Sequence, residues 1–242
     1  MPLALALVLL AGTAAAAVVP APGYLARTLA TPDVVQGGVV RHAGAVLVGQ
    51  GSFGPASEYV VRLDSAGSTV VATGFNSLGG IDVAPNGELF VVDNGGELPG
   101  AVTGDTLFEF PDALTRQTSL AAAGHEVLPP GTLPAAQDVL LVPETLLVTE
   151  ATGPGAGRVL RVSEQGLPSP FVGGLDYASG LAFGSTGAVY VAELDASFVG
   201  RVRVFDYVTG ELRREVASGL SGAFAVALDA DGETVLVSGG VA

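Results

Sequence analysis

The sequence predicts an all-β protein in which four-stranded antiparallel units are arranged as the blades of a β-propeller. Beyond about residue 35, apolar and polar residues alternate in short runs, which is the period of a β-strand. The segment GIDVAPNGELFVVD at 80–93 returns as GLAFGSTGAVYVAE at 180–193 and as AVALDADGETVLVS at 225–238. Repeated units of four short strands are typical of propeller blades.

The strands are expected along the chain as pairs of hairpins. The first hairpins of successive units are expected at 39–50, 80–93, 139–150, 180–193 and 225–238. Second hairpins are expected after the first four of them, at 59–74, 105–124, 158–174 and 201–219. Short turns containing Gly, Asn or Asp reverse the chain inside these hairpins. The sequence therefore predicts four complete blades and a partial fifth.

A single blade of this kind exposes an apolar surface on both sides, and only stacking against neighbours around a ring buries both. The residues expected between blades include Val83, Phe90, Val92, Phe183 and Tyr190. Glycines stand at the start of several first strands, which indicates close backbone approach near a crowded axis. They are Gly79, Gly80, Gly180 and Gly222.

Composition excludes several classes of function. The chain has 242 residues, of which 49% are apolar, so it can form one large domain with its own core. Its 24 acidic residues outnumber its 10 basic ones, and the net charge of −14 makes nucleic acid and anionic membranes unfavourable partners. The absence of cysteine excludes disulfides, thiolate nucleophiles and cysteine metal sites.

The three repeated segments quoted above resemble the core motif of NHL-repeat and SMP-30/gluconolactonase-like propellers. This resemblance covers most of the chain from about Val39 onward. It implies a ring that typically has six blades. Members include lactonases, lyases, carbohydrate or protein binders and structural modules, so the resemblance does not select one activity. In SMP-30-like members, Glu, Asn and Asp side chains hold a divalent cation near the central axis.

The two ends of the chain lead to further expectations. Residues 3–10 are apolar and precede an A-x-A pattern at 15–17, which is typical of an export signal at 1–17. A disordered start is the alternative. The remaining 18–242 would form a single propeller domain of a secreted or periplasmic protein with no membrane span. Segment 24–35 reads as a closing fourth strand, and the sequence ends inside the fifth unit. We therefore expect a truncated six-bladed ring, the alternative being five blades with one incomplete.

The connections are expected to differ between the two faces of the ring. Turns within each hairpin are tight, such as PNG at 85–87 and TG at 209–210. Connections between the two hairpins of a unit, and between units, are expected to be longer, such as 93–104 and 123–137. In a four-stranded meander these two classes lie on opposite faces. Binding residues are expected on the long-loop face, because loops on rigid scaffolds commonly carry function.

Three carboxylates stand at equivalent ends of second strands: Asp93, Glu150 and Glu193. They are expected on the long-loop face, where oxygen ligands from several blades could hold a hard cation such as Ca²⁺. In the alternative interpretation, each acid accepts hydrogen bonds from the amides of its own loop. Direct catalysis by these carboxylates is the third possibility.

His125, in the segment AGHEVLPPG, is the only histidine expected on the long-loop face and is a candidate general base. A solvated loop histidine is the alternative. Two aromatic residues in long loops, Phe53 and Phe198, could line a ligand groove or be buried against the blades.

Two functional hypotheses follow. In the first, a secreted monomeric propeller binds a small molecule, a carbohydrate or a protein through its long-loop face. In the second, the protein is a divalent-cation-dependent hydrolase or lyase of the gluconolactonase kind. Its metal ligands would then be Asp93, Glu150 and Glu193, with His125 or a carboxylate as the base.

Overall fold

The computed structural model describes residues 35–52, 54–95, 104–115, 125–229, 232 and 234–238. The export signal expected at 1–17 and the loop residue Phe53 lie outside these residues. So does the closing strand expected at 24–35, except for residue 35. Every regular element in the described part of the chain is a β-strand. No helix that could cross a membrane is found there.

Four antiparallel sheets of four strands each follow one another along the chain. The first contains β1 (Val35–His42), β2 (Ala45–Gly51), β3 (Glu58–Asp64) and β4 (Gly67–Phe75). The second contains β5 (Leu78–Val83), β6 (Leu89–Asp93), β7 (Thr106–Phe110) and β8 (His125–Glu126). The third contains β9 (Ala136–Val142), β10 (Thr145–Glu150), β11 (Gly157–Val162) and β12 (Pro168–Leu175).

The fourth sheet and a final hairpin complete the described chain. The sheet contains β13 (Tyr177–Gly184), β14 (Ala188–Leu194), β15 (Val199–Asp206) and β16 (Leu212–Ser221), and the hairpin contains β17 (Ala225–Leu228) and β18 (Val235–Ser238). Four complete blades and a partial fifth are therefore confirmed. The expectation of a truncated six-bladed ring is not tested and stays a prediction.

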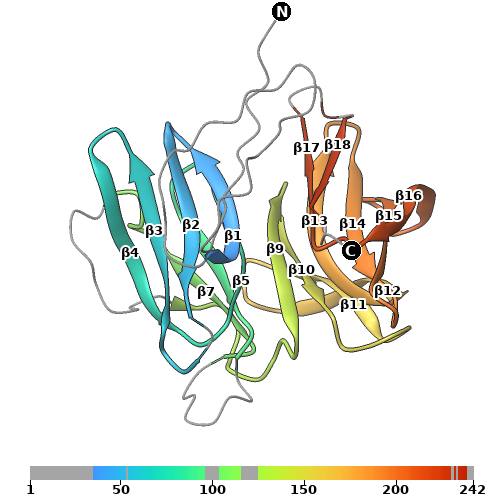
Figure 1. Ribbon diagram of the computed structural model, residues 1–242, viewed down its shortest axis with the longest axis horizontal. Helices are drawn as coiled ribbons and strands as arrows, with labels where there is room; N and C mark the ends of the chain where they lie inside the picture. The colour runs from blue at the N-terminus through green and yellow to red at the C-terminus, as the bar shows by residue number, and fades with distance from the viewer. Residues whose placement is uncertain are drawn as a thin grey trace, which may run out of the picture.

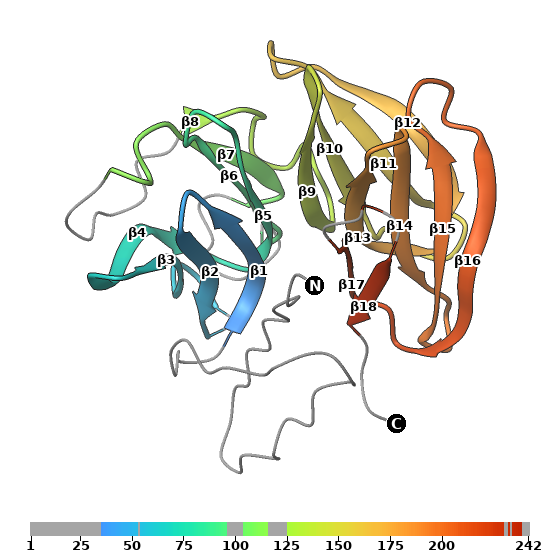
Figure 2. The ribbon, with the colours of Figure 1, turned by 90° about the horizontal axis from the view of Figure 1, so that it is seen from above.

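The sheets stand side by side around a common centre, as the blades of a propeller do (Figures 1 and 2). The first strand of each blade is innermost, and β1, β5, β9, β13 and β17 contact one another in that order. Within each blade the strands follow in sequence order, with the fourth strand outermost. The β-propeller fold predicted from the repeats is thus confirmed.

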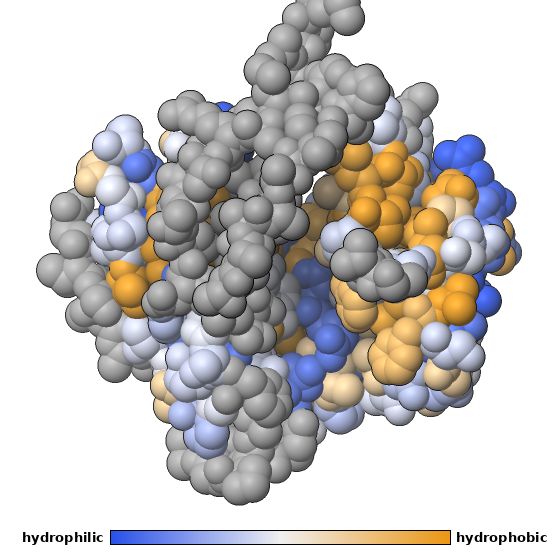
Figure 3. All heavy atoms as spheres, in the orientation of Figure 1, coloured by the Kyte–Doolittle hydropathy of each residue, from blue (hydrophilic) through white to orange (hydrophobic). Residues whose placement is uncertain are grey.

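The apolar core lies between the blades, as the stacking argument requires. Phe90 and Val92 of β6 share a buried cluster with Val139, Leu146 and Leu160 of the third blade. Figure 3 shows further apolar surface over the hairpin β17–β18 and the neighbouring part of the fourth blade, where Phe224 and Leu236 are exposed.

Two glycines of the inner strands are required by close packing. A Cβ atom on Gly80 would lie 1.7 Å from Oδ1 and 2.8 Å from Cα of Asp138 in the next blade. A Cβ atom on Gly180 would lie 2.7 Å from Cα of Ala225. Side chains at these positions would force the inner strands apart, which confirms the crowded axis inferred from the glycines.

The connections differ in part from the expectation. Long loops join β2 to β3, β6 to β7 and β10 to β11, as expected, but most connections between blades are short. Only Asn76 and Ser77 separate β4 from β5, and only Asp176 separates β12 from β13. The expectation of long inter-blade loops is wrong at these junctions, because the outer strand runs on almost to the next inner strand.

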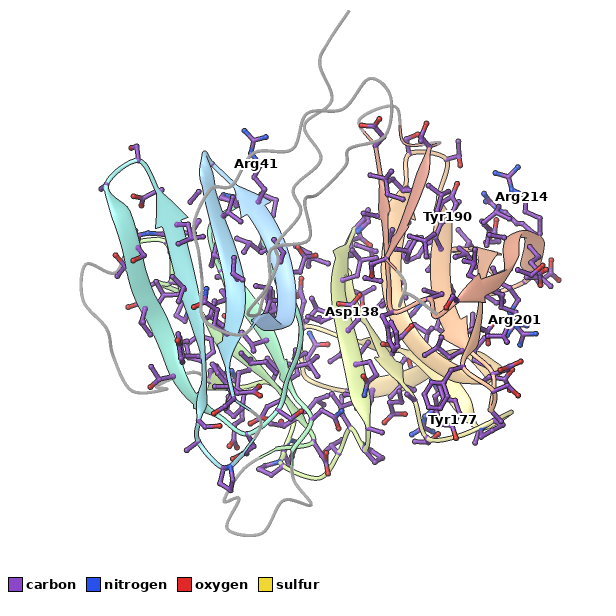
Figure 4. All side chains as sticks on the ribbon, in the orientation of Figure 1. Arg41, Asp138, Tyr177, Tyr190, Arg201 and Arg214 are labelled. Atoms are coloured by element: carbon purple, nitrogen blue, oxygen red, sulfur yellow. The ribbon has the colours of Figure 1, made fainter. Side chains whose placement is uncertain are left out.

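The two faces are named here by their connections. The long-loop face carries the loops between second and third strands, and the tight-turn face carries the hairpin turns. In Figure 4, Arg41 near the first hairpin turn lies at the top and Tyr177 at the start of β13 lies at the bottom. The tight-turn face is therefore uppermost in this view, and the long-loop face is lowermost.

Candidate functional site

The three strand-end carboxylates lie on the long-loop side of their blades, but none of them is open to solvent. Asp93 ends β6, Glu150 ends β10 and Glu193 is the penultimate residue of β14. All three side chains are fully buried. A buried carboxylate is costly unless it is paired or hydrogen-bonded, so the partners of each residue decide its role.

Asp93 fixes the junction between the first two blades. Its carboxylate accepts hydrogen bonds from the backbone N–H groups of Asn76 at 3.1 Å and Ser77 at 3.0 Å, and from Asn76 Nδ2 at 3.2 Å. Nearby, Glu58 of β3 accepts a hydrogen bond from the N–H of Leu78. Burial raises the pKa values of Asp93 and Glu58, and the backbone hydrogen bonds partly offset the increase.

Glu193 lies in an ionic network within the fourth blade. Arg201 Nε donates to its carboxylate at 2.9 Å, Arg203 Nη2 donates at 3.0 Å and the N–H of Asp176 donates at 2.9 Å. The Asp176 carboxylate accepts a further bond from Arg201 at 2.9 Å. Burial alone would raise the pKa of Glu193, but the hydrogen bonds from the two arginines outweigh burial and hold the pKa below its usual value.

Glu150 has fewer partners than its counterparts. Its Oε2 atom accepts a hydrogen bond from Arg158, whereas its buried Oε1 atom has no partner among the described residues. One orphaned carboxylate oxygen is far from the six to eight oxygen ligands that Ca²⁺ takes. The described part of the chain contains no group of three or more His, Asp or Glu side chains that could hold a metal ion. The residues described here do not fit a calcium site.

The structure therefore does not bring Asp93, Glu150 and Glu193 together. The donors that the structure describes are arginines and inter-blade linkers, whereas the alternative interpretation expected the amides of the loop after each acid. A sequence signal for the arginines exists. Arg158 follows Glu150 by eight positions and Arg201 follows Glu193 by eight, and both pairs lie directly opposite across their hairpins. Such opposite charges pair across antiparallel strands.

The position expected for His125 is wrong. The residue lies in β8, opposite Glu109 of β7, rather than in a loop between blades. Glu109 in turn pairs with Phe90 near the first hairpin turn of this blade, which places His125 toward the tight-turn face. Its Nδ1 atom is 3.8 Å from Glu109 Oε2, and its side chain is 76% exposed. The candidate base is therefore separated from the strand-end carboxylates.

Phe198 is the exposed aromatic residue of the described long loops. It is among the most exposed large apolar residues, with 66% of its surface accessible. The alternative of burial against the blade is therefore wrong for Phe198. Asp195 orders the loop, because its Oδ1 atom accepts hydrogen bonds from the N–H groups of Ser197 at 2.7 Å and Val199 at 2.9 Å. Phe198 has a left-handed φ of 59°, which is uncommon for a bulky residue.

Two inner-strand carboxylates were not expected from the sequence. Asp82 accepts hydrogen bonds from the N–H groups of Val83 at 2.8 Å and Leu141 at 2.7 Å. Asp138 does the same for Val139 at 2.9 Å and Leu181 at 2.8 Å. Each carboxylate thus links its own inner strand to that of the next blade. The sequence signal was an acidic residue inside an apolar first strand.

These inner carboxylates are perturbed by their surroundings. Burial raises the pKa of Asp138 to about 7, and the proximity of Asp82 adds to the increase. Burial also raises the pKa of Asp82. Figure 4 shows Asp138 on β9 in the middle of the molecule. Perturbed pKa values are common at functional sites, but here each carboxylate also caps an N–H group of a neighbouring strand.

Comparisons with known proteins support the fold and leave the activity open. No protein-family model matches the chain, and no curated protein matches its sequence. Among solved structures, a protein provisionally described as a gluconolactonase aligns with a TM-score of 0.62 and 15% identity, over 88% of this chain and 74% of its own. The PQQ-bound aldose sugar dehydrogenase of Streptomyces coelicolor aligns with a TM-score of 0.66 and 17% identity. The alignment covers 88% of this chain and 76% of the dehydrogenase chain.

A third aligned structure is the computationally designed protein Ika8, with a TM-score of 0.47 and 17% identity. This chain spans 78% of its own length in that alignment and 51% of the designed protein. The two natural structures bear out the resemblance to gluconolactonase-like propellers. At these identities the likeness establishes the fold alone.

Proposed function

We propose that this protein is a carbohydrate-binding propeller that uses the long-loop face around Phe198. The observation that carries the proposal is the exposure of the Phe198 side chain on a hydrogen-bonded loop. Burying an aromatic side chain of this size on a ligand is favourable, and a loop backbone that is already hydrogen-bonded loses little entropy on binding. A strained backbone that displays a large apolar group to solvent is better explained by a ligand than by stability.

Polar groups near the same end of the fourth and third blades can supply hydrogen bonds. The side chains of Arg158 and Arg201 are 44% and 34% exposed. The Nε atom of each forms an ion pair with a buried glutamate, Glu150 or Glu193. Their orientation is fixed by those ion pairs, which favours specific recognition. An aromatic platform with ordered donors suits a sugar. The descriptions of the two natural aligned structures, a gluconolactonase and an aldose sugar dehydrogenase, favour the same ligand class.

The proposal can be tested on an array of neutral and acidic oligosaccharides. We expect discrete binding by the wild-type protein and a loss of about tenfold in affinity for Phe198→Ala, since a buried aromatic contact contributes more than 1 kcal/mol. Val208→Ala is the matched control, because Val208 is 78% exposed in the turn between β15 and β16 on the other face. No binding, or equal loss in both variants, would contradict the proposal.

The cation-dependent hydrolase remains the second candidate, because the gluconolactonase-like alignment covers most of the chain. Its test is the hydrolysis of glucono-1,5-lactone with and without added Ca²⁺. Calcium-stimulated hydrolysis would favour the enzyme over the binding module and would require calcium ligands other than the three strand-end carboxylates. Unchanged hydrolysis in the presence of Ca²⁺, with no calcium-induced shift in the unfolding midpoint, would count against it.

A further inference from the structure

A groove lies between the second and third blades on the tight-turn face, away from the site proposed above. Its cavity measures about 660 Å³. The walls come from the first hairpin turns of both blades, at 84–88 and 142–146, and from the second hairpin turn of the third blade at 162–164. Cavities of this size hold drug-sized molecules.

The groove combines an apolar interior with negative charge. Phe90, Leu141 and Leu146 belong to its apolar lining. Four glutamates from separate turns and strands also line it, namely Glu88, Glu109, Glu144 and Glu164. Among the described residues no basic side chain lines the cavity, and only Glu109 has an ionisable partner, His125 at 3.8 Å.

We propose that this groove binds an organic cation that has an apolar body, such as a quaternary ammonium compound. Carboxylates beside apolar walls attract a cation more strongly than they would in open water, because the local dielectric constant is lower. The Phe90 ring adds a surface that a weakly hydrated ammonium group can contact. An anionic ligand would meet only like charge.

The spacing of the four glutamates favours an organic cation over a metal ion as the ligand of this groove. A hard cation needs several oxygen atoms within 2.3 to 2.6 Å of one point. The described residues contain no group of three carboxylate or histidine side chains that could meet that requirement. A larger cation with diffuse charge is stabilised by carboxylates spread around it, and its apolar body fills the space between the blades.

Benzyltrimethylammonium is a suitable probe, with benzyl alcohol and benzenesulfonate as neutral and anionic controls. Calorimetric titration of the full-length protein should show saturable binding of one benzyltrimethylammonium and at least about tenfold weaker binding of both controls. Higher salt should weaken the interaction, because Glu144 and Glu164 are exposed and salt screens their charges. Absence of saturation would overturn the proposal.

Variants locate the binding. Glu88→Gln and Glu164→Gln should each weaken benzyltrimethylammonium binding by about threefold to tenfold, and Phe90→Leu by about threefold. Glu211→Gln is the matched control, because Glu211 is an exposed glutamate in a turn of another blade. Equal weakening in Glu211→Gln would indicate general attraction to a protein of net charge −14 and would overturn the proposal.

The main competing occupant is a lysine side chain of another protein. An oligolysine peptide that binds more tightly than benzyltrimethylammonium, and loses affinity in Glu88→Gln and Glu164→Gln, would assign the groove to a protein partner and overturn the small-cation proposal. This experiment is independent of the proposed carbohydrate site, because Phe198→Ala should leave the binding of benzyltrimethylammonium unchanged.

Discussion

Glu193 and Asp206 both pair with arginines in the fourth blade, yet their surroundings give them different roles. The Glu193 side chain is fully buried between Arg201 and Arg203, whereas Asp206 and Arg213 form a pair at the surface. Exposed pairs contribute little to stability, because water and salt screen them. Removing one partner of a buried pair leaves the remaining charges uncompensated, which is strongly destabilising.

We therefore predict that Glu193→Gln lowers the free energy of unfolding by about 2–4 kcal/mol, measured by urea denaturation. The guanidinium groups of Arg201 and Arg203 would lose their common partner in a region that water reaches only in part. Asp206→Asn is the control and should lower the unfolding midpoint less, because the pair is at the surface and an asparagine keeps the oxygen that accepts from Val208 and Thr209. Equal effects of the two substitutions would show that the Glu193 network is no more than a surface contact.

A second prediction concerns pH. The pKa of Asp138 is about 7 in the folded protein against 3.8 for an ordinary aspartate, so the folded state binds this proton more tightly than the unfolded state. The resulting contribution to folding stability is fully present below the pKa of the unfolded state. It is lost as pH rises through the pKa of the folded state. Between about pH 5 and 8 the wild-type protein should lose more stability than Asp138→Asn, which stays neutral. Parallel stability profiles would contradict this prediction.

At the scale of single elements, the inner strands are the most constrained. They lack a hydrogen-bonded neighbour on the side of the axis, and Asp82 and Asp138 supply acceptors for two of their N–H groups. The glycines at 38, 80 and 180 let the strands come close enough for these contacts. An inner strand therefore requires small residues and side chains that accept hydrogen bonds, in addition to alternating apolar residues.

Gly80→Ala should destabilise the protein by about 1–3 kcal/mol, because the new methyl group would overlap the Asp138 side chain and approach its Cα atom. Thermal unfolding measures the effect. Gly173→Ala in the outer strand β12 is the control, since a methyl group there meets no atom within 4 Å. A tolerated Gly80→Ala would mean that the inner strands can separate at little cost.

At the scale of the whole molecule, stability comes from surfaces that neighbouring blades share. The cluster around Leu147 joins Val159 and Val172 of the third blade to Leu181 and Val191 of the fourth. No blade has a core of its own in the described chain, because each sheet is one layer thick. A substitution that destabilises one blade should therefore also destabilise the neighbouring blade.

Leu147→Ala tests this coupling. We expect a loss of about 2–5 kcal/mol and faster hydrogen exchange in β14 as well as β10, because the cavity opens between the blades. Leu167→Ala in the same blade is the control, as Leu167 is 66% exposed and touches no core cluster. Faster exchange confined to the third blade would contradict the shared core.

The sequence by itself determined the blade architecture, because alternation and repeated turns are local features that require no knowledge of distant contacts. The copies at 80–93 and 180–193 became the hairpins β5–β6 and β13–β14, and the glycines within them marked the crowded axis. The position of the strand-end carboxylates at the long-loop ends of their strands also followed from the repeats.

Only the tertiary structure decided what those carboxylates do. Burial, and the arginines and linker amides that surround Asp93 and Glu193, depend on cross-strand register and on contacts between units. The same dependence moved His125 into β8 and revealed the links through Asp82 and Asp138. Local pattern specifies which strands form, whereas the electrostatic environment of a side chain is set by residues that the fold brings to it from elsewhere in the chain.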